Sequence, residues 1–274
     1  MNLLRRKYYP VCVVVALCSW LRSERPAPIK KPSFERFMNT TQSIQIRRSE
    51  DRGDANLGWL ESKHSFSFGE YYDPAFMGFR SLRVINQDRV LPGQGFPTHP
   101  HRDMEIFSYV LEGSLKHQDS MGNGRVLEPG QIQLMSAGSG VTHSEFNPSK
   151  TSGLHFLQIW IQPESEGLDP SYTEWHPAAD DPDGKVLIIS SDGRDGSALI
   201  HQDADVYRVR LNPGEAVDHE LRSGRGLWLQ VISGPVRLNG EELFSGDAGS
   251  SEEVGRFEIS AADADVEALL FDLR

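Results

Sequence analysis

The sequence predicts an all-β protein built from two strand-rich halves, with few helices. Short segments rich in β-branched and aromatic residues alternate with turn signals, and no long stretch repeats its apolar residues at the helical period. The chain of 274 residues contains 25 glycines and 16 prolines, which fits a fold with many turns. Its length allows two modest domains, each with its own core. Several short strands at this spacing are typical of a sandwich or barrel.

Residues 1–38 differ in composition from the rest and are expected to lie outside the fold. They contain eight Lys or Arg, two Glu and both cysteines, Cys12 and Cys18. The apolar run at 8–21 is too short for a bilayer-spanning helix, which needs about 20 residues. We interpret the segment as the product of too early a start codon, with Met38 as the true start, which implies a cytoplasmic protein. The alternatives are a secretory signal, which would export the chain, and a functional anchor.

The charge of the remaining chain excludes one class of partner. The net charge is −11, and residues 39–274 carry 20 basic against 37 acidic residues. Such a body repels phosphate backbones, so direct binding of nucleic acid is not expected, and neither is a membrane partner. Because no cysteine lies beyond residue 38, this part has no disulfide, thiol nucleophile or thiolate ligand.

The first half is predicted to be a domain at residues 39–165. Turn signals such as Pro92-Gly93 and Pro129-Gly130 separate its apolar segments, and SMGNG at 120–124 is typical of a hairpin turn. The predicted strands are SLRVINQDRV at 81–90, MEIFSYVL at 104–111, QIQLM at 131–135 and LHFLQIWIQ at 154–162.

A second domain is predicted at residues 185–274, after a linker or crossover at 166–184 that is rich in Pro and Asp. The stretch LNPGEAVDHELRSGRGLWLQVISGPVRLNGEELFSGDAG at 211–249 repeats glycines and hydrophobic residues of the first half. The repeat indicates two copies of one architecture. Where the first half has two histidines, the second offers only Val217, Asp218 and His219, so we expect it to lack a metal site.

Two short motifs of the first half carry candidate metal ligands. The motif HPH contains His99 and His101, and the motif HSE contains His143 and Glu145. Residues two apart on a strand face the same side, so two adjacent strands would bring three imidazoles and a carboxylate together. Nitrogen and oxygen donors suit iron, manganese, nickel, copper or zinc, and the absence of thiolate argues against a structural zinc. The periodicity also admits Glu105, four residues after His101, as the carboxylate ligand.

Longer segments resemble the pirin family of the cupin superfamily, most closely its bacterial members of the quercetin 2,3-dioxygenase type. The resemblance runs from about Ile44 to the C-terminus. It implies a bicupin fold, made of two jelly-roll β-barrels. The segments that carry it are HSFSFGEYYDPAFMGFRSLRVIN at 64–86, THPHRDMEIFSYVLEG at 98–113, HQDSMGN at 117–123 and MSAGSGVTHSEFNPS at 135–149.

The resemblance implies a site and an activity. The metal ligands would be His99, His101, His143 and Glu145, which leaves Glu105 as a supporting or structural residue. One divalent transition metal per chain is expected, with Fe(II) preferred over Mn, Ni, Co, Cu or Zn. The implied reaction is cleavage of the central ring of a flavonol such as quercetin by O2, with release of carbon monoxide, and Glu145 would take the proton of the 3-hydroxyl. The alternative is a metal-binding protein partner of a transcription regulator, without turnover.

Other conspicuous residues have two interpretations each. His117 is interpreted as a hydrogen-bonded surface histidine rather than a ligand, and His155, in an apolar strand, as a core residue that could instead face a pocket. The aromatic residues at 66–79 are expected to pack against the barrel, with stacking on a flat polyphenol as the alternative.

Overall fold

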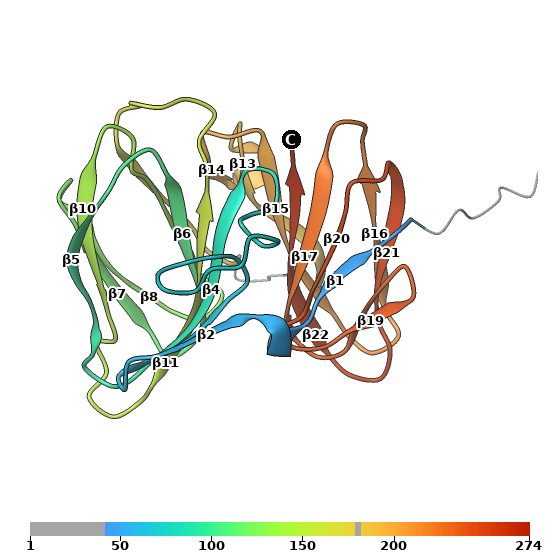
Figure 1. The fold of residues 1–274 in the computed structure, drawn as a ribbon, viewed down its shortest axis with the longest axis horizontal. Helices are drawn as coiled ribbons and strands as arrows, with labels where there is room; N and C mark the ends of the chain where they lie inside the picture. Colours follow the sequence, from blue (N-terminus) through green and yellow to red (C-terminus); the bar gives the residue numbers. More distant parts are fainter. Residues whose placement is uncertain (1–41, 179–181) are drawn as a thin grey trace, which may run out of the picture. The chain divides into compact units, whose positions relative to one another are not determined.

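The computed structural model describes residues 42–178 and 182–274, and Figure 1 shows them as two halves built from strands. The predictions made for residues 1–38 lie outside the described residues. Each half pairs a seven-stranded sheet with a four-stranded sheet. The described residues contain no α-helix and only two 3-10 turns, η1 (Ser49–Asp51) and η2 (Arg194–Gly196). The predicted all-β bicupin is therefore confirmed, with each half an open cupin-like sandwich rather than a closed barrel.

In the first half the seven-stranded sheet has the order β12-β9-β6-β11-β4-β3-β2, and the smaller sheet has the order β5-β10-β7-β8. The bounds are β2 (Gly53–Asn56), β3 (Leu60–His64), β4 (Leu82–Val90), β5 (Gly95–His101), β6 (Glu105–Glu112), β7 (Leu115–Asp119), β8 (Gly124–Leu127), β9 (Ile132–Ser136), β10 (Val141–Phe146), β11 (Leu154–Ile161) and β12 (Ser171–Trp175). The four predicted strands are present as β4, β6, β9 and β11, and the predicted hairpin turn joins β7 to β8.

The second half repeats this arrangement, with the orders β1-β20-β17-β22-β15-β13-β14 and β16-β21-β18-β19. The bounds are β1 (Gln45–Arg47), β13 (Gly184–Ser190), β14 (Ala198–Leu199), β15 (Ala204–Leu211), β16 (Ala216–Leu221), β17 (Gly226–Ser233), β18 (Val236–Leu238), β19 (Glu241–Leu243), β20 (Ala248–Ser251), β21 (Gly255–Ala261) and β22 (Val266–Leu273).

Two strands pair across the predicted domain limits. The strand β1 precedes the first half but pairs with β20 of the second, and in Figure 1 it lies beside the orange and red strands. The strand β12 lies inside the segment predicted as a linker but pairs with β9 of the first half. Each therefore occupies the same edge of its own seven-stranded sheet. Pairing follows the free edge of a sheet rather than chain order, so the sequence pattern alone does not assign such strands.

A hydrophobic cluster lies between the two seven-stranded sheets. It contains Phe107 and Tyr109 of β6 together with Trp228 and Phe271 of the second half. Burying a side chain such as Phe107 stabilises the fold by about 1.5–3 kcal/mol relative to exposure. The alternate residues of β6, such as Ser108, face the interior of the first sandwich. Because both faces of these sheets are covered, their strands are almost continuously buried.

Within the described residues we find no helix with the length and hydrophobicity needed to cross a membrane. The cellular location given by the sequence stays a prediction.

Candidate metal centre

Three histidines converge on the interior of the first sandwich. The strands β5 and β10 are antiparallel neighbours, and their register places His143 directly opposite His99. His101 lies two residues further along β5 and therefore shares the face of His99. Ligand nitrogens of all three lie within 4.8 Å of one another, and the Nε2 atoms of His99 and His143 are 3.1 Å apart. The predicted convergence of three imidazoles is therefore present.

The nitrogen positions fit a bound metal ion. Two ligands about 2.1 Å from one metal and at right angles would lie about 3.0 Å apart, close to the observed 3.1 Å between His99 and His143. The Nδ1–H of His99 donates to the carbonyl of Pro97 at 2.7 Å, which leaves the Nε2 lone pair free for a metal. The Nε2 atom of His101 is buried and has no hydrogen-bond partner among the described residues. A divalent metal would satisfy these atoms.

Burial keeps two of the imidazoles, those of His101 and His143, neutral, which is the form that binds metals. Burial, followed by the charge of neighbouring His143, lowers the pKa of His101 to about 4. Burial, followed by the charge of His99, lowers the pKa of His143 to about 3. Both rings are therefore unprotonated at neutral pH.

Glu145 is fully buried next to His143. A β-bulge follows His143, so Glu145 pairs with Phe96 of β5. Its Oε1 accepts hydrogen bonds from the Ser108 hydroxyl at 2.7 Å and the Gln133 amide at 3.1 Å, and its Oε2 accepts one from the Gln158 amide. These donors hold the carboxylate in place without a cation.

The structure divides the predicted ligands between two overlapping groups. One group contains His99, His101 and His143, and the other contains His117, His143 and Glu145. His143 is common to both groups and links the carboxylate to the cluster of three histidines. The assignment of all four predicted residues as ligands of one metal stays a prediction.

His117 is not a surface residue, so that interpretation of the sequence was wrong. Its side chain is fully buried on β7 directly opposite Glu145. The ring bonds the carboxylate of Asp119 at 3.1 Å and stacks on Tyr172, with ring centroids 5.3 Å apart. The alternation of Leu115 and His117 was the signal, because it puts both residues on the inward face.

Glu105 does not belong to the site, although strand periodicity admitted it. It lies on β6, in the sheet that faces β5, and three residues before Ser108, so it projects from the opposite face. Its carboxylate accepts hydrogen bonds from the Ser136 hydroxyl at 2.6 Å and from the backbone N–H of His201 at 3.3 Å. Glu105 therefore joins the two halves and is a structural residue.

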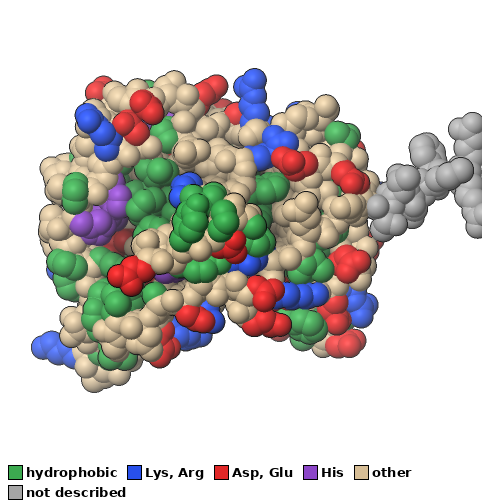
Figure 2. All heavy atoms as spheres, viewed as in Figure 1, with side chains coloured by type: hydrophobic (Ala, Val, Ile, Leu, Met, Phe, Trp, Pro, Cys, Tyr) green, Lys and Arg blue, Asp and Glu red, His purple; other side chains and the backbone are tan. Residues whose placement is uncertain are grey.

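His99 and His101 form part of the wall of a cavity of about 320 Å³. In Figure 2 a patch of histidine side chains reaches the surface of the first half and is bordered by hydrophobic side chains. One side of the cavity is apolar and aromatic, and includes Phe68 and Trp160, whose rings meet edge to face at 5.4 Å. The residues that line it are Leu60, Ser62, His64, Phe68, Asn86, Asp88, Phe96, Pro97, Thr98, His99, His101, Gln158 and Trp160.

The aromatic run at 66–79 is divided between the two expected roles. Phe66 and Phe79 pack against Trp228 between the halves, with ring centroids 4.9 and 5.6 Å apart. Packing was the favoured interpretation and holds for these rings. Phe68 instead lines the cavity beside the histidines.

Asp88 is a residue of the cavity that sequence reasoning missed. Burial raises the pKa of its carboxyl to about 7, against the opposing effect of the Ser62 hydroxyl, and the negative charge of Glu145 raises the pKa further. Asn86 and Asp88 share one face of β4, and the other buried residues of this strand are hydrophobic. Two polar residues on one face of a strand with a hydrophobic buried set were a signal of a lined cavity.

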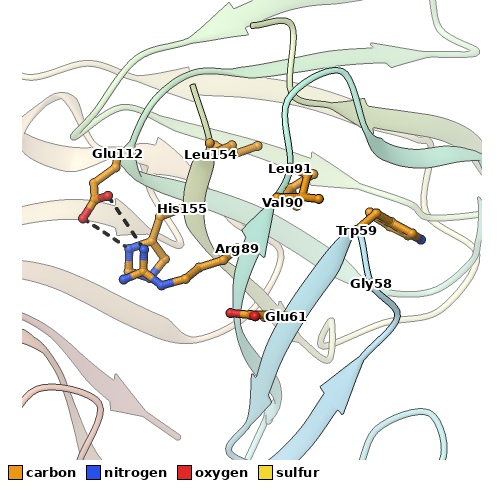
Figure 3. A pocket seen from close by; sticks show the side chains of 10 residues that line it. Gly58, Trp59, Glu61, Arg89, Val90, Leu91, Glu112, Leu154 and His155 are labelled. Carbon is orange, nitrogen blue, oxygen red and sulfur yellow. Dashed lines mark ion pairs between the residues drawn. The ribbon is translucent and has the colours of Figure 1, made fainter. Parts of the chain in front are cut away.

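A second cavity, of about 300 Å³, lies on the other face of the same sheet (Figure 3). His155 lines it, and Figure 3 shows the Glu112 carboxylate directed toward His155 and Arg89. The His155 Nδ1 and the Arg89 guanidinium lie 3.7 and 3.8 Å from Glu112. His155 therefore faces a pocket, but this pocket holds none of the metal-binding groups found among the described residues.

Comparisons with known proteins cover most of both halves. A family model described as Pirin matches residues 45–161, and one described as Quercetinase C-terminal cupin domain matches residues 187–273. The quercetin 2,3-dioxygenase of Escherichia coli K12 is 50% identical over 230 residues, which covers 84% of this chain and 98% of that protein.

Solved structures are similar in fold. The bacterial pirin YhhW from Escherichia coli in complex with nickel(II) has a TM-score of 0.80 and 49% identity, over 84% of this chain and 99% of that one. The Escherichia coli protein YhaK has a TM-score of 0.62 and 31% identity, over 81% and 97% of the two chains.

Proposed function

The chain belongs to the pirin family, and we propose that it is a metal-dependent dioxygenase that cleaves the central ring of flavonols such as quercetin with O2 and releases carbon monoxide. The observation that carries the proposal is the convergence of three imidazoles beside an aromatic cavity, which His99 and His101 line, together with the neutral state of His101 and His143. The identity of 50% to a protein named quercetin 2,3-dioxygenase supports the choice of substrate.

We propose His99, His101, His143 and Glu145 as the ligands of one divalent metal, with Fe(II) preferred. Three imidazoles and one carboxylate also accept Mn, Ni, Co, Cu or Zn, because first-row metals share these donors. A metal held there would supply a Lewis acid with open positions for a substrate oxygen and for O2.

The cavity would seat the flat substrate. The rings of Phe68 and Trp160 provide apolar surface, and Trp160 lies edge to face with His101 at 4.9 Å. A flavonol in contact with these rings would direct its 3-hydroxyl toward the histidines. The aromatic wall also removes water from the reacting atoms, which strengthens electrostatic interactions there.

Glu145 would act as the base that removes the proton of the 3-hydroxyl. Its carboxylate is buried beside His143 and accepts hydrogen bonds from Ser108, Gln133 and Gln158. These neutral donors fix its orientation and do not compete for the proton. General base catalysis of this kind contributes about 10²–10⁴ in rate.

The proposal is tested by oxygen consumption. Purified protein loaded with Fe(II) and the same protein stripped by a chelator are each mixed with quercetin under air, and carbon monoxide is trapped. We expect O2 uptake and loss of quercetin absorbance in equal amounts, with carbon monoxide as product, only in the loaded sample. Protein that holds metal but leaves quercetin intact would contradict the proposal and favour the alternative role as a protein partner of a transcription regulator.

A further inference from the structure

Four polar side chains form a compact patch on one side of the cavity. Ser62 and His64 of β3 pair across the strands with Asp88 and Asn86 of β4, respectively. Residues two apart on a strand share a face, so all four project to the same side. All four line the cavity that His99 and His101 also line, so we call them the polar patch.

The polar patch is buried but lacks partners. The side chains of Ser62, His64, Asn86 and Asp88 are 2–6% exposed. His64 Nδ1, Asn86 Oδ1 and Asp88 Oδ1 have no hydrogen-bond partner in the described part of the chain. One buried polar atom without a partner costs about 1–3 kcal/mol. Three such atoms beside one cavity indicate that a bound molecule supplies the missing partners.

The chemistry of the patch selects the groups that it binds. Asn86 Oδ1 and Asp88 Oδ1 are acceptors, and His64 Nδ1 accepts a hydrogen bond in the tautomer that carries the proton on Nε2. Hydroxyl groups are the matching donors. An anionic substituent would be repelled by the carboxyl group of Asp88, and an apolar one would leave all three atoms unsatisfied.

We propose that the polar patch recognises hydroxyl groups of the substrate other than the one that faces the histidines, and so makes the protein selective for polyhydroxylated flavonols. The proposal rests on the proposed function, because it assumes a flavonol in the cavity. Rings such as Trp160 would contact any flavonol, whereas the patch distinguishes one flavonol from another. A site built to bind a hydroxyl group rejects an analogue that lacks it, because its own polar groups are then left unpaired.

The test compares the binding of three flavonols. Quercetin has five hydroxyl groups, galangin lacks the two on the outer ring, and 3-hydroxyflavone has only the 3-hydroxyl. Dissociation constants are measured for metal-loaded protein under nitrogen by quenching of tryptophan fluorescence, so that no turnover occurs. We expect wild type to bind quercetin at least tenfold more tightly than 3-hydroxyflavone.

Variants then locate the source of this preference. Asp88→Leu and Asn86→Leu should each reduce the preference several-fold, mainly by weakening quercetin binding. Asp88→Asn keeps an acceptor oxygen and should retain most of the preference. Glu61→Gln, on the other face of β3, is the matched control and should bind like wild type. Metal content is measured for each variant, and His64→Phe replaces any leucine variant that fails to fold.

An unchanged preference in Asp88→Leu and Asn86→Leu would overturn the proposal, as would a wild type that binds all three flavonols equally or none of them. The two proposals fail in different ways. A protein with the expected preference but no O2 uptake keeps the polar patch and loses the dioxygenase. A protein that cleaves quercetin but whose variants bind normally keeps the dioxygenase and loses the patch.

Discussion

The two halves of the chain have the same strand order, but the first contains a buried cluster of histidines and a carboxylate where most of the corresponding residues of the second are hydrophobic. The register matches them residue by residue: His143 pairs with His99 in the first half as Phe257 pairs with His219 in the second. The corresponding pairs, first half before second, are His99 and His219, His101 and Leu221, His117 and Leu238, His143 and Phe257, Glu145 and Ile259, Ser108 and Leu229, Gln158 and Leu270, and Asp88 and Val209.

The imidazole that occupies the interior of the second half at a position corresponding to a proposed ligand has a structural role. His219 bonds the carboxylate of Asp272 at 2.8 Å, and Asp272 also accepts a hydrogen bond from Arg225. The sequence comparison placed Val217, Asp218 and His219 opposite the two histidines of the first half, whereas the register places His219 and Leu221 there. The same fold therefore tolerates a polar or a hydrophobic interior at these positions, and the polar side chain that the second half keeps there is paired with a carboxylate.

The largest expected effect comes from the carboxylate of the first half. Glu145→Gln removes the negative charge and the proton acceptor but keeps the shape, so quercetin cleavage should fall by about 10²–10⁴. Glu105→Gln is the matched control, because that carboxylate faces the second half. Its cleavage rate should stay close to wild type. The rate of loss of quercetin absorbance is measured alongside metal content. The reverse result, with Glu105→Gln inactive and free of metal, would point to Glu105 as the ligand.

The second largest effect should be on metal content, which a substitution in the first half should lower and the corresponding substitution in the second half should not. His101→Ala removes one proposed ligand, so elemental analysis should fall well below the value of about one metal per chain expected for wild type. Leu221→Ala changes the corresponding position of the second half and should keep the metal, while it loses about 2–5 kcal/mol of stability to a cavity. A reproducible value near two metals in wild type would show a second site and break the comparison.

The third contrast between the halves concerns the pH dependence of the free energy of unfolding. The buried Asp88 has a pKa raised to about 7 from 3.8, so the folded chain binds this proton more tightly than the unfolded chain. Ionisation of the buried carboxyl therefore lowers the free energy of unfolding. This loss is small near pH 4, grows as the pH rises toward 7, and is constant at higher pH.

Asp88→Val copies Val209 of the second half and removes this penalty. The free energy of unfolding of the metal-free variant should exceed that of metal-free wild type by a margin that widens from pH 4 to 7, reaching a few kcal/mol. Denaturant titrations at several pH values measure it. A margin that is independent of pH would show that Asp88 does not titrate in this range.

The smallest effect should be a loss of stability on replacing a turn glycine, and it should be equal in the two halves. Gly113 and Gly234 occupy corresponding turns with φ of 77° and 84°. A Cβ at either position would lie 2.5 Å from a backbone oxygen, that of Gly153 or of Asp265. Gly113→Ala and Gly234→Ala should therefore each lower the stability by about 1–3 kcal/mol, without a specific loss of metal. Thermal unfolding of both variants tests this, and a large difference between them would show that the turns are not equivalent.

Local patterns in the sequence were enough to predict several features of this protein. A strand alternates its side chains with a period of two, so the HPH and HSE motifs were sufficient to predict three imidazoles on one face. The repeated glycines indicated two copies of one fold, and Gly113 and Gly234 show why, since only glycine fits where backbone segments approach so closely. The main strands could also be predicted from short segments, because segments rich in β-branched and aromatic residues alternate with turn residues along the chain.

Contacts between segments that are far apart in sequence determine which strands face one another and which face of each strand is buried. Glu105 has the strand period of a ligand but belongs to another sheet and faces the second half. His117 was taken for a surface residue, but it is buried directly opposite Glu145 of the neighbouring strand β10. The polar patch exists only because β3 pairs with β4 in one register, and β1 joins the second half because an edge is free there. These outcomes depend on contacts between residues far apart in sequence, and a one-residue change of register would reverse every face. A local pattern therefore shows which residues share a face, but not which other strand that face meets.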